Sequence, residues 1–146
     1  MSRVETTRDV ATCLAIRKAV FTDEQGVAES DDVDGLDETA VQFLLFENKA
    51  AVGTARMLVA GDCGKIGRVA VLKHHRGGGH GAALITAAVA EARHRGLARV
   101  KLGSRADTTA FYARLGFRPE GDIFDDVGIP HQMMVLSMTG GSGDVQ

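Results

Sequence analysis

The sequence is poor in the residues that would support several common classes of protein. It has only two cysteines among 146 residues, Cys13 and Cys63, and neither stands at zinc-ligand spacing from another ligand. No apolar run approaches ~18 residues, and the chain does not open on a basic segment followed by an apolar one. These absences argue against a metal centre, a membrane span and export, and a reducing cytoplasm is the simplest setting.

Motifs that bind nucleotides or nucleic acids are also missing. Aromatic residues make up only 5%, with no stacking motif or basic recognition helix, which disfavours a nucleic-acid module. No Gly-Lys-Ser/Thr occurs, so a Walker loop is absent. A dinucleotide fingerprint could be written over Gly77, Gly79 and Ala82, but about twenty residues later the chain has Arg99 and Lys101 instead of an acidic ribose ligand.

The overall composition is that of an ordinary globular protein, with 45% hydrophobic and 25% charged residues. A chain of this length suits one domain and can bury roughly two thirds of its unfolded surface, so it needs neither a metal nor a disulfide to fold. We expect residues 1–139 to form a single domain and the Gly/Ser-rich residues 140–146 to form a tail.

Charge is distributed unevenly along the chain. Residues 65–118 contain eleven lysines and arginines against two acids, Glu91 and Asp107, and the rest of the chain is acidic. The acids concentrate in residues 23–38, where eight of sixteen are Asp or Glu. Such blocks are often solvated surface. The alternative is a pair of sites of opposite sign, a basic one for a phosphorylated ligand and an acidic one that attracts a cation.

Hydrophobic periodicity predicts an α/β (α+β) chain of alternating helices and strands. A helix over residues 9–21 is expected to be capped by Thr7 or Asp9 and to lead into a polar acidic loop. The other expected elements, in chain order, are an antiparallel hairpin of strands 40–47 and 51–60, a strand at 65–72, a helix from 79 to a C-cap at Gly96, a strand at 98–104, a helix at 107–116 and a strand at 131–138.

The densest pattern joins the third strand to the second helix, where Arg76 is followed by glycines at 77, 78, 79 and 81. A glycine turn that opens a helix presents unpaired backbone N–H groups and the positive end of the helix dipole to an anion. Glycine removes the Cβ atoms that would hold a phosphate away, and Arg76 adds a charged contact. The alternative is a glycine-rich turn without a ligand. The pattern favours a phosphate-binding turn.

Two ordered motifs resemble the GNAT superfamily of acyl-CoA N-acyltransferases. Arg76, Gly79 and Gly81 stand at the defining positions of its R/Q-x-x-G-x-G/A signature, and residues 111–117 are similar to its F-Y-x-x-x-G-F segment. "EQGV" from Glu24 and "GIPHQM" from Gly128 resemble the ElaA-like, or YjcF-like, group. The resemblance spans nearly the whole chain. It implies a GNAT fold, a mixed and mostly antiparallel sheet with splayed central parallel strands and about four flanking helices.

The resemblance also implies an N-acetyltransferase that moves an acetyl group from acetyl-CoA to a primary amine by direct attack in a ternary complex, without a metal. The pyrophosphate of CoA would lie over the glycine turn, and the pantetheine arm would bond the backbone of the preceding strand. Arg105 replaces the Asn or Gln that many members have seven residues before the tyrosine. The implied cofactor-binding residues are Val69, Ala70, Val71, Arg76, Gly77, Gly78, Gly79, His80, Gly81, Ala82 and Arg105.

For catalysis, the resemblance implies that Tyr112, the only tyrosine, lies near the CoA sulfur as general acid; a core tyrosine is the alternative. The general base stays open between Glu24, His131 and a water chain to bulk solvent. If residues 23–38 line the acceptor mouth, their charge favours a cationic amine such as a polyamine, an amino sugar or a lysine side chain. Homodimers are common among such domains, and a non-catalytic acyl-CoA sensor is the alternative function.

Overall fold

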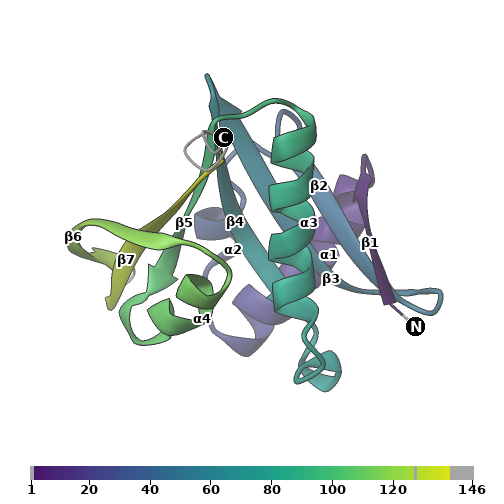
Figure 1. The fold of residues 1–146 in the computed structure, drawn as a ribbon. Helices are drawn as coiled ribbons and strands as arrows, with labels where there is room; N and C mark the ends of the chain where they lie inside the picture. The colour runs from purple at the N-terminus through teal and green to yellow at the C-terminus, as the bar shows by residue number, and fades with distance from the viewer. Residues whose placement is uncertain (1, 127, 139–146) are drawn as a thin grey trace. The chain divides into compact units, whose positions relative to one another are not determined.

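The computed structural model describes residues 2–126 and 128–138, so the expected tail at 140–146 lies outside the described residues. The chain falls into two compact units: the chain up to Leu58 with Ile66–Ala90, and Val59–Lys65 with the chain from Glu91 onward. The described strands and α-helices (Figure 1) are β1 (Ser2–Thr7), α1 (Val10–Arg17), α2 (Glu29–Asp32), β2 (Val41–Glu47), β3 (Ala50–Ala60), β4 (Cys63–Val71), α3 (His80–His94), β5 (Arg99–Arg105), α4 (Thr109–Arg114), β6 (Arg118–Asp126) and β7 (Ile129–Ser137).

In the first unit the strands follow the order β1-β2-β3-β4. The predicted hairpin is confirmed: β2 and β3 pair antiparallel, with Phe43 opposite Ala55 and a register shift between Leu45 and Phe46. Strand β1 pairs antiparallel with β2 on the other side and was not expected. Its sequence, "SRVETT", has one aliphatic residue, Val4, and therefore lacks the apolar alternation that signals a strand.

Helices α1 and α3 cover opposite faces of this sheet, one behind and one in front of the strands in Figure 1. Cys13 of α1 lies in a buried cluster with Leu44 of β2. On the other face, a Cβ added at Gly53 would meet Leu84 of α3 at 3.3 Å and Leu45 of β2 at 3.4 Å. Because consecutive strand residues point to opposite faces, Leu44 lies on the face covered by α1 and Leu45 on the face covered by α3. Full burial of each leucine contributes about 1.5–3 kcal/mol.

The first helix starts as predicted, and of the two expected cap residues Asp9 is the N-cap. The Asp9 carboxylate accepts a hydrogen bond from Thr12 N (3.1 Å), and Thr7 Oγ1 accepts one from Asp9 N (3.0 Å). Where a polar loop was expected after residue 21, the chain continues as a π-helical segment, Lys18–Glu24, and then forms the short helix α2. The expected loop therefore contains helical turns.

In the second unit the strand order is β5-β7-β6, and both neighbouring pairs are antiparallel. The predicted strands at β5 and β7 and the helix α4 are confirmed. Strand β6 was missed. All nine of its residues are exposed, and its sequence contains Pro119, Gly121 and four acids, so it has neither apolar alternation nor strand-forming composition. No helix among the described residues has the length and apolar character needed to cross a membrane.

Candidate active site

The glycine turn lies in the first unit, between β4 and α3, after a single 3-10 turn at Lys73–His75. Gly77 and Gly79 have φ values of 88° and 81°. This left-handed region strains any residue with a Cβ, so the backbone itself requires glycine there. A Cβ built at Gly77, Gly79 or Gly81 would meet no heavy atom within 4 Å. The turn therefore presents bare backbone to open space.

Helix α3 begins directly after this turn, at His80, and is 15 residues long. Ala83 N donates to Gly79 O at 3.0 Å, and the N–H groups that precede it belong to the first turn, which has no intrahelical acceptors. The positive end of the helix dipole points to the same place. Bare backbone, free N–H groups and a helix N-terminus together suit a phosphate group.

Arg76 is engaged with two other groups expected at the site. Its Nε donates to Val71 O at 2.8 Å, and its Nη1 and Nη2 each donate to one oxygen of Glu24 at 2.6 Å. The hydrogen bonds from Arg76 hold the pKa of Glu24 below its usual range. The structure thus brings two predicted site residues together in a fork, although the sequence places them 52 residues apart.

The two histidines that flank the turn both contact Glu47, the last residue of β2. His75 Nδ1 lies 2.6 Å from Glu47 Oε1, and His80 Nε2 lies 2.9 Å from Glu47 Oε2. Hydrogen bonds from His80 and then His75 lower the pKa of Glu47, so the carboxylate stays ionised at neutral pH. Glu47 was not among the predicted site residues, because nothing in its local sequence connects it to a turn about thirty residues later.

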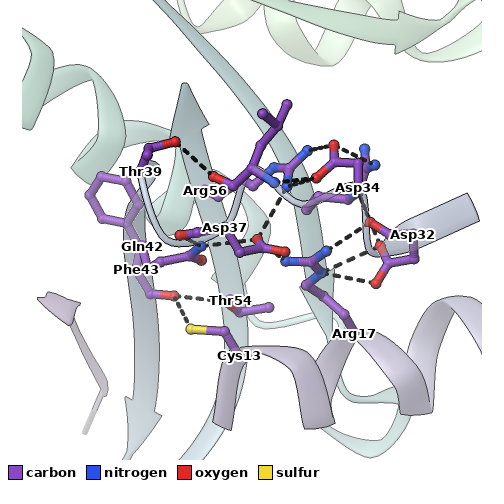
Figure 2. A network of polar contacts seen from close by, with 12 residues as sticks. Cys13, Arg17, Asp32, Asp34, Asp37, Thr39, Gln42, Phe43, Thr54 and Arg56 are labelled. Atoms are coloured by element: carbon purple, nitrogen blue, oxygen red, sulfur yellow. Dashed lines mark hydrogen bonds and ion pairs between the residues drawn. The ribbon is translucent and has the colours of Figure 1, made fainter. Parts of the chain in front are cut away.

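The acidic segment is held by three arginines from other elements, two of which, Arg17 and Arg56, are labelled in Figure 2. Arg17, only 1% exposed, bonds Asp37 Oδ1 at 2.5 Å and Asp32 Oδ2 at 3.1 Å. Arg56 of β3, 3% exposed, bonds Asp34 Oδ2 at 2.5 Å and Asp37 Oδ1 at 3.1 Å. The third arginine is Arg68 of β4. It bonds Asp32 Oδ1 at 3.0 Å and Asp34 Oδ2 at 3.4 Å. Three cations neutralise three carboxylates inside the first unit.

This network leaves less free negative charge in residues 23–38 than the formal count suggested. Two further acids are also paired, Asp23 with Lys18 and Glu24 with Arg76. The acids of this segment that remain exposed without an ion pair among the described residues are Glu29, Asp31 and Glu38. Any attraction of a cationic acceptor by this segment therefore falls to these three side chains.

The same network predicts a loss of stability in acid. Hydrogen bonds from Arg56 hold the pKa of Asp34 well below its usual range. Burial opposes ionisation of Asp37, but hydrogen bonds from Arg17 and Gln42 bring its pKa below the ordinary value of 3.8. A group with a depressed folded pKa stabilises fully above its unfolded pKa and loses that contribution progressively as the pH falls from the unfolded pKa through the folded pKa. We expect the free energy of unfolding to drop below about pH 4, by at most about 1 kcal/mol per carboxylate at pH 3.

Urea unfolding between pH 6 and pH 3 measures this slope. In Asp34→Asn the slope should become shallower, whereas Asp31→Asn, at an exposed and unpaired position, should leave it unchanged. A free energy of unfolding that stays level down to pH 3 in the unmodified protein would contradict the expectation.

Tyr112 lies in the second unit, on α4. Its ring makes edge contacts with Phe111 (centroids 5.0 Å apart) and Phe117 (6.2 Å). Its carbonyl accepts hydrogen bonds from Leu115 N and Phe117 N, which close the helix before Gly116, whose φ is 100°. Burial raises the pKa of the Tyr112 hydroxyl, so it is fully protonated at neutral pH. The F-Y-x-x-x-G-F segment therefore forms the C-terminal end of α4 and holds the protonated side chain of Tyr112 in a fixed orientation.

His131, also in the second unit, is held by β7 and by its own turn. Its Nδ1–H donates to Ile129 O at 2.8 Å, which leaves Nε2 of the neutral ring with a free lone pair. Nε2 lies 4.0 Å from an oxygen of Asp126, and the His131 side chain is 15% exposed.

Arg105 is exposed at the end of β5 and pairs with Asp107 at 3.4 Å. Within residues 2–126 and 128–138 no three His, Cys, Asp or Glu side chains are grouped to hold a metal.

Comparison with known proteins relates this chain to acetyltransferases. The model of the acetyltransferase (GNAT) family matches residues 11–117. The uncharacterized protein YyaT of Bacillus subtilis (strain 168) is 31% identical over 142 residues, covering 95% of this chain and 96% of YyaT. YjcF of the same organism, named an uncharacterized N-acetyltransferase, is 30% identical over 121 residues, covering 82% of this chain and 86% of YjcF.

Solved structures agree. The crystal structure of Escherichia coli ElaA matches with a TM-score of 0.83 and 29% identity, over 94% of this chain and 100% of ElaA. The predicted fold class, a mixed sheet flanked by helices in the GNAT arrangement, is confirmed. The resemblance drawn from the two signatures is confirmed as well. The chain belongs to the acetyltransferase (GNAT) family, in its ElaA-like or YjcF-like group.

Proposed function

We propose that this acyltransferase moves an acetyl group from acetyl-CoA to a primary amine by direct attack in a ternary complex. The observation that carries the proposal is the glycine turn at the start of α3, with its left-handed glycines, open backbone and helix N-terminus. Acetyl-CoA supplies the activated thioester. Every other part of the chemistry falls to the side chains and backbone of the chain itself.

The turn and the strand before it hold the cosubstrate. Backbone N–H groups of residues 77–82 bind the pyrophosphate, and the backbone of Val69–Val71 bonds the pantetheine arm, as in the family. In the structure, Arg76 donates hydrogen bonds to Val71 O and to the Glu24 carboxylate. When the cosubstrate binds, Arg76 exchanges these partners for phosphate oxygens. Arg105 contributes a further contact, and His80 and Ala82 contribute backbone groups of the first helical turn.

Tyr112 stabilises the departing thiolate. Its raised pKa keeps the hydroxyl protonated, so it can donate a hydrogen bond or a proton to sulfur. Of the two candidate bases, His131 offers a free Nε2 lone pair. The Glu24 carboxylate is neutralised by Arg76 and accepts a proton readily only after that pair opens. The geometry therefore favours His131 as the base.

For the acceptor we propose a cationic amine that approaches the exposed acids Glu29, Asp31 and Glu38. Variants of Asp32 or Asp34 do not test this idea, because these residues also hold the buried network together. A cytoplasmic location and homodimer formation stay predictions.

A pair of glycine variants tests the proposed CoA site. Gly79→Ala places a Cβ on a residue with φ of 81°, which costs about 1–2 kcal/mol and drives the turn out of its left-handed shape. We expect CoA to bind about tenfold more weakly by isothermal titration calorimetry, since 1.4 kcal/mol is tenfold in affinity. Gly81→Ala is the control, because Gly81 lies inside α3 and the family signature accepts alanine there. Equal affinities for both variants and the unmodified protein would refute the proposed role of the turn.

A further inference from the structure

The glycine turn has little packing of its own to fix its shape. A Cβ at Gly77 or Gly79 would meet nothing within 4 Å, and one at Gly78 would meet only the His80 ring, at 3.8 Å. Glycine residues lose more conformational freedom on ordering than any other residue. A turn of this composition needs an external contact if its N–H groups are to be arranged before a ligand arrives.

One carboxylate supplies that contact at both ends of the turn. His75 precedes Arg76, and His80 is the first residue of α3, so together they bracket residues 76–79. Both rings bond Glu47, at 2.6 Å and 2.9 Å, through contacts that reach back 28 and 33 residues to the end of β2. His80 is only 7% exposed, so its ring is fixed in this orientation.

We propose that Glu47 is a positioning residue for the cosubstrate, which holds the two flanks of the turn through His75 and His80. The inference rests on the proposed function, because the ligand of the turn is there the pyrophosphate of CoA. Without Glu47 the turn samples many shapes, and the apparent dissociation constant rises in inverse proportion to the fraction that can bind. A carboxylate next to a phosphate site is otherwise unfavourable, because like charges repel.

The test measures CoA affinity by isothermal titration calorimetry. We expect Glu47→Ala to bind CoA about tenfold more weakly, as it would if one tenth of the molecules had a formed turn. His75→Ala should also weaken binding, but by less than Glu47→Ala, because the contact between Glu47 and His80 remains. Glu47→Gln should be intermediate, because its amide oxygen still accepts one hydrogen bond. His74→Ala is the matched control, since His74 is the exposed neighbour and has no hydrogen bond or ion pair among the described residues; its affinity should stay within about twofold.

Two further readouts separate positioning from general damage to the fold. The double variant Glu47→Ala/His75→Ala should bind no more than about twofold more weakly than Glu47→Ala, because the contact with His75 is already lost in that single variant. In Glu47→Ala, amide hydrogen exchange should accelerate at His75 and Ala83, whose N–H groups donate to Leu72 O and Gly79 O at the two ends of the turn, and stay unchanged in β3. If Glu47→Ala proves too unstable to titrate, His75→Ala with the same exchange measurement decides the question.

The outcomes are distinct. Glu47→Ala or His75→Ala binding CoA as tightly as the unmodified protein, or more tightly, would overturn the positioning role while the proposed function stands. Failure of the unmodified protein to bind CoA would overturn the proposed function and this inference with it.

Discussion

Replacing Arg17 with methionine should lower the free energy of unfolding by about 3–5 kcal/mol. Arg17 is the most buried arginine of the network, and its guanidinium bonds the carboxylates of Asp32 and Asp37 and the carbonyl of Asp32. Methionine fills a similar volume but leaves two buried carboxylates short of donors. Removing one partner of a buried ion pair is costly because the charge left behind stays out of water. Urea unfolding at pH 7 measures the change.

The adjacent residue provides a matched control. Lys18 pairs with Asp23 at 3.2 Å, but their side chains are 50% and 56% exposed. Lys18→Met removes the same type of interaction in the same stretch of chain, and water replaces the lost contact, so the cost should stay below about 0.5 kcal/mol. Arg17→Lys should be intermediate, because it keeps the charge and loses the planar fork. A cost below about 1 kcal/mol for Arg17→Met would show that the buried network does not hold the first unit together.

Replacing Tyr112 with phenylalanine should reduce kcat for acetyl transfer by about 10²-fold, the lower end of the range for a lost general acid. The substitution removes only the hydroxyl and keeps the ring that contacts Phe111 and Phe117. A thiol has a lower pKa than a tyrosine whose pKa is raised above 10, so complete proton transfer to the thiolate is uphill. The hydroxyl therefore acts chiefly by donating a hydrogen bond as charge develops on sulfur.

This role predicts a specific pattern of kinetic constants. The dissociation constant for CoA and the Tm of Tyr112→Phe should match those of the unmodified protein, because the hydroxyl stabilises the transition state and not the bound cosubstrate. Steady-state kinetics with a saturating amine, together with calorimetry, measure both. A kcat within about threefold of the unmodified value would assign Tyr112 to packing, with its hydroxyl at the rim of the core.

The elements that could be predicted from sequence are those with a strong local pattern. The hairpin, α1, α3, α4, β5 and β7 all carry apolar periodicity or a cap such as Asp9. Strands β1 and β6 carry neither; they are held by backbone pairing to a neighbour, β2 in one case and β7 in the other. Pairing of this kind depends on residues far away in the chain and leaves little trace in the strand's own sequence.

The candidate site shows the same division. The glycine turn was predictable because left-handed φ values and a helix start leave local signals at Gly77 and Gly79. The contacts of Arg76 with Glu24 and of His75 with Glu47 were not, because each joins residues far apart in the sequence. These contacts can be predicted only once the fold is known.

The acidic segment held one signal that sequence reasoning could have used. Arg17 and Arg56 each stand within apolar stretches, "LAIRKAV" and "VGTARMLVA", where burial is expected. A buried arginine needs carboxylate partners. The nearby excess of acids in residues 23–38 could therefore have been assigned to internal ion pairs before it was assigned to an acceptor.

The most direct test of the central claim is acetyl transfer itself. The purified protein is incubated with acetyl-CoA and, in turn, a polyamine, an amino sugar and a lysine peptide, while free CoA thiol and N-acetylated amine are measured together. We predict that thiol and acetylated amine appear in equal amounts for at least one amine, and that Tyr112→Phe slows the formation of both by about 10²-fold. Tight binding of acetyl-CoA with no amine-dependent thiol release would contradict it and would favour an acyl-CoA sensor.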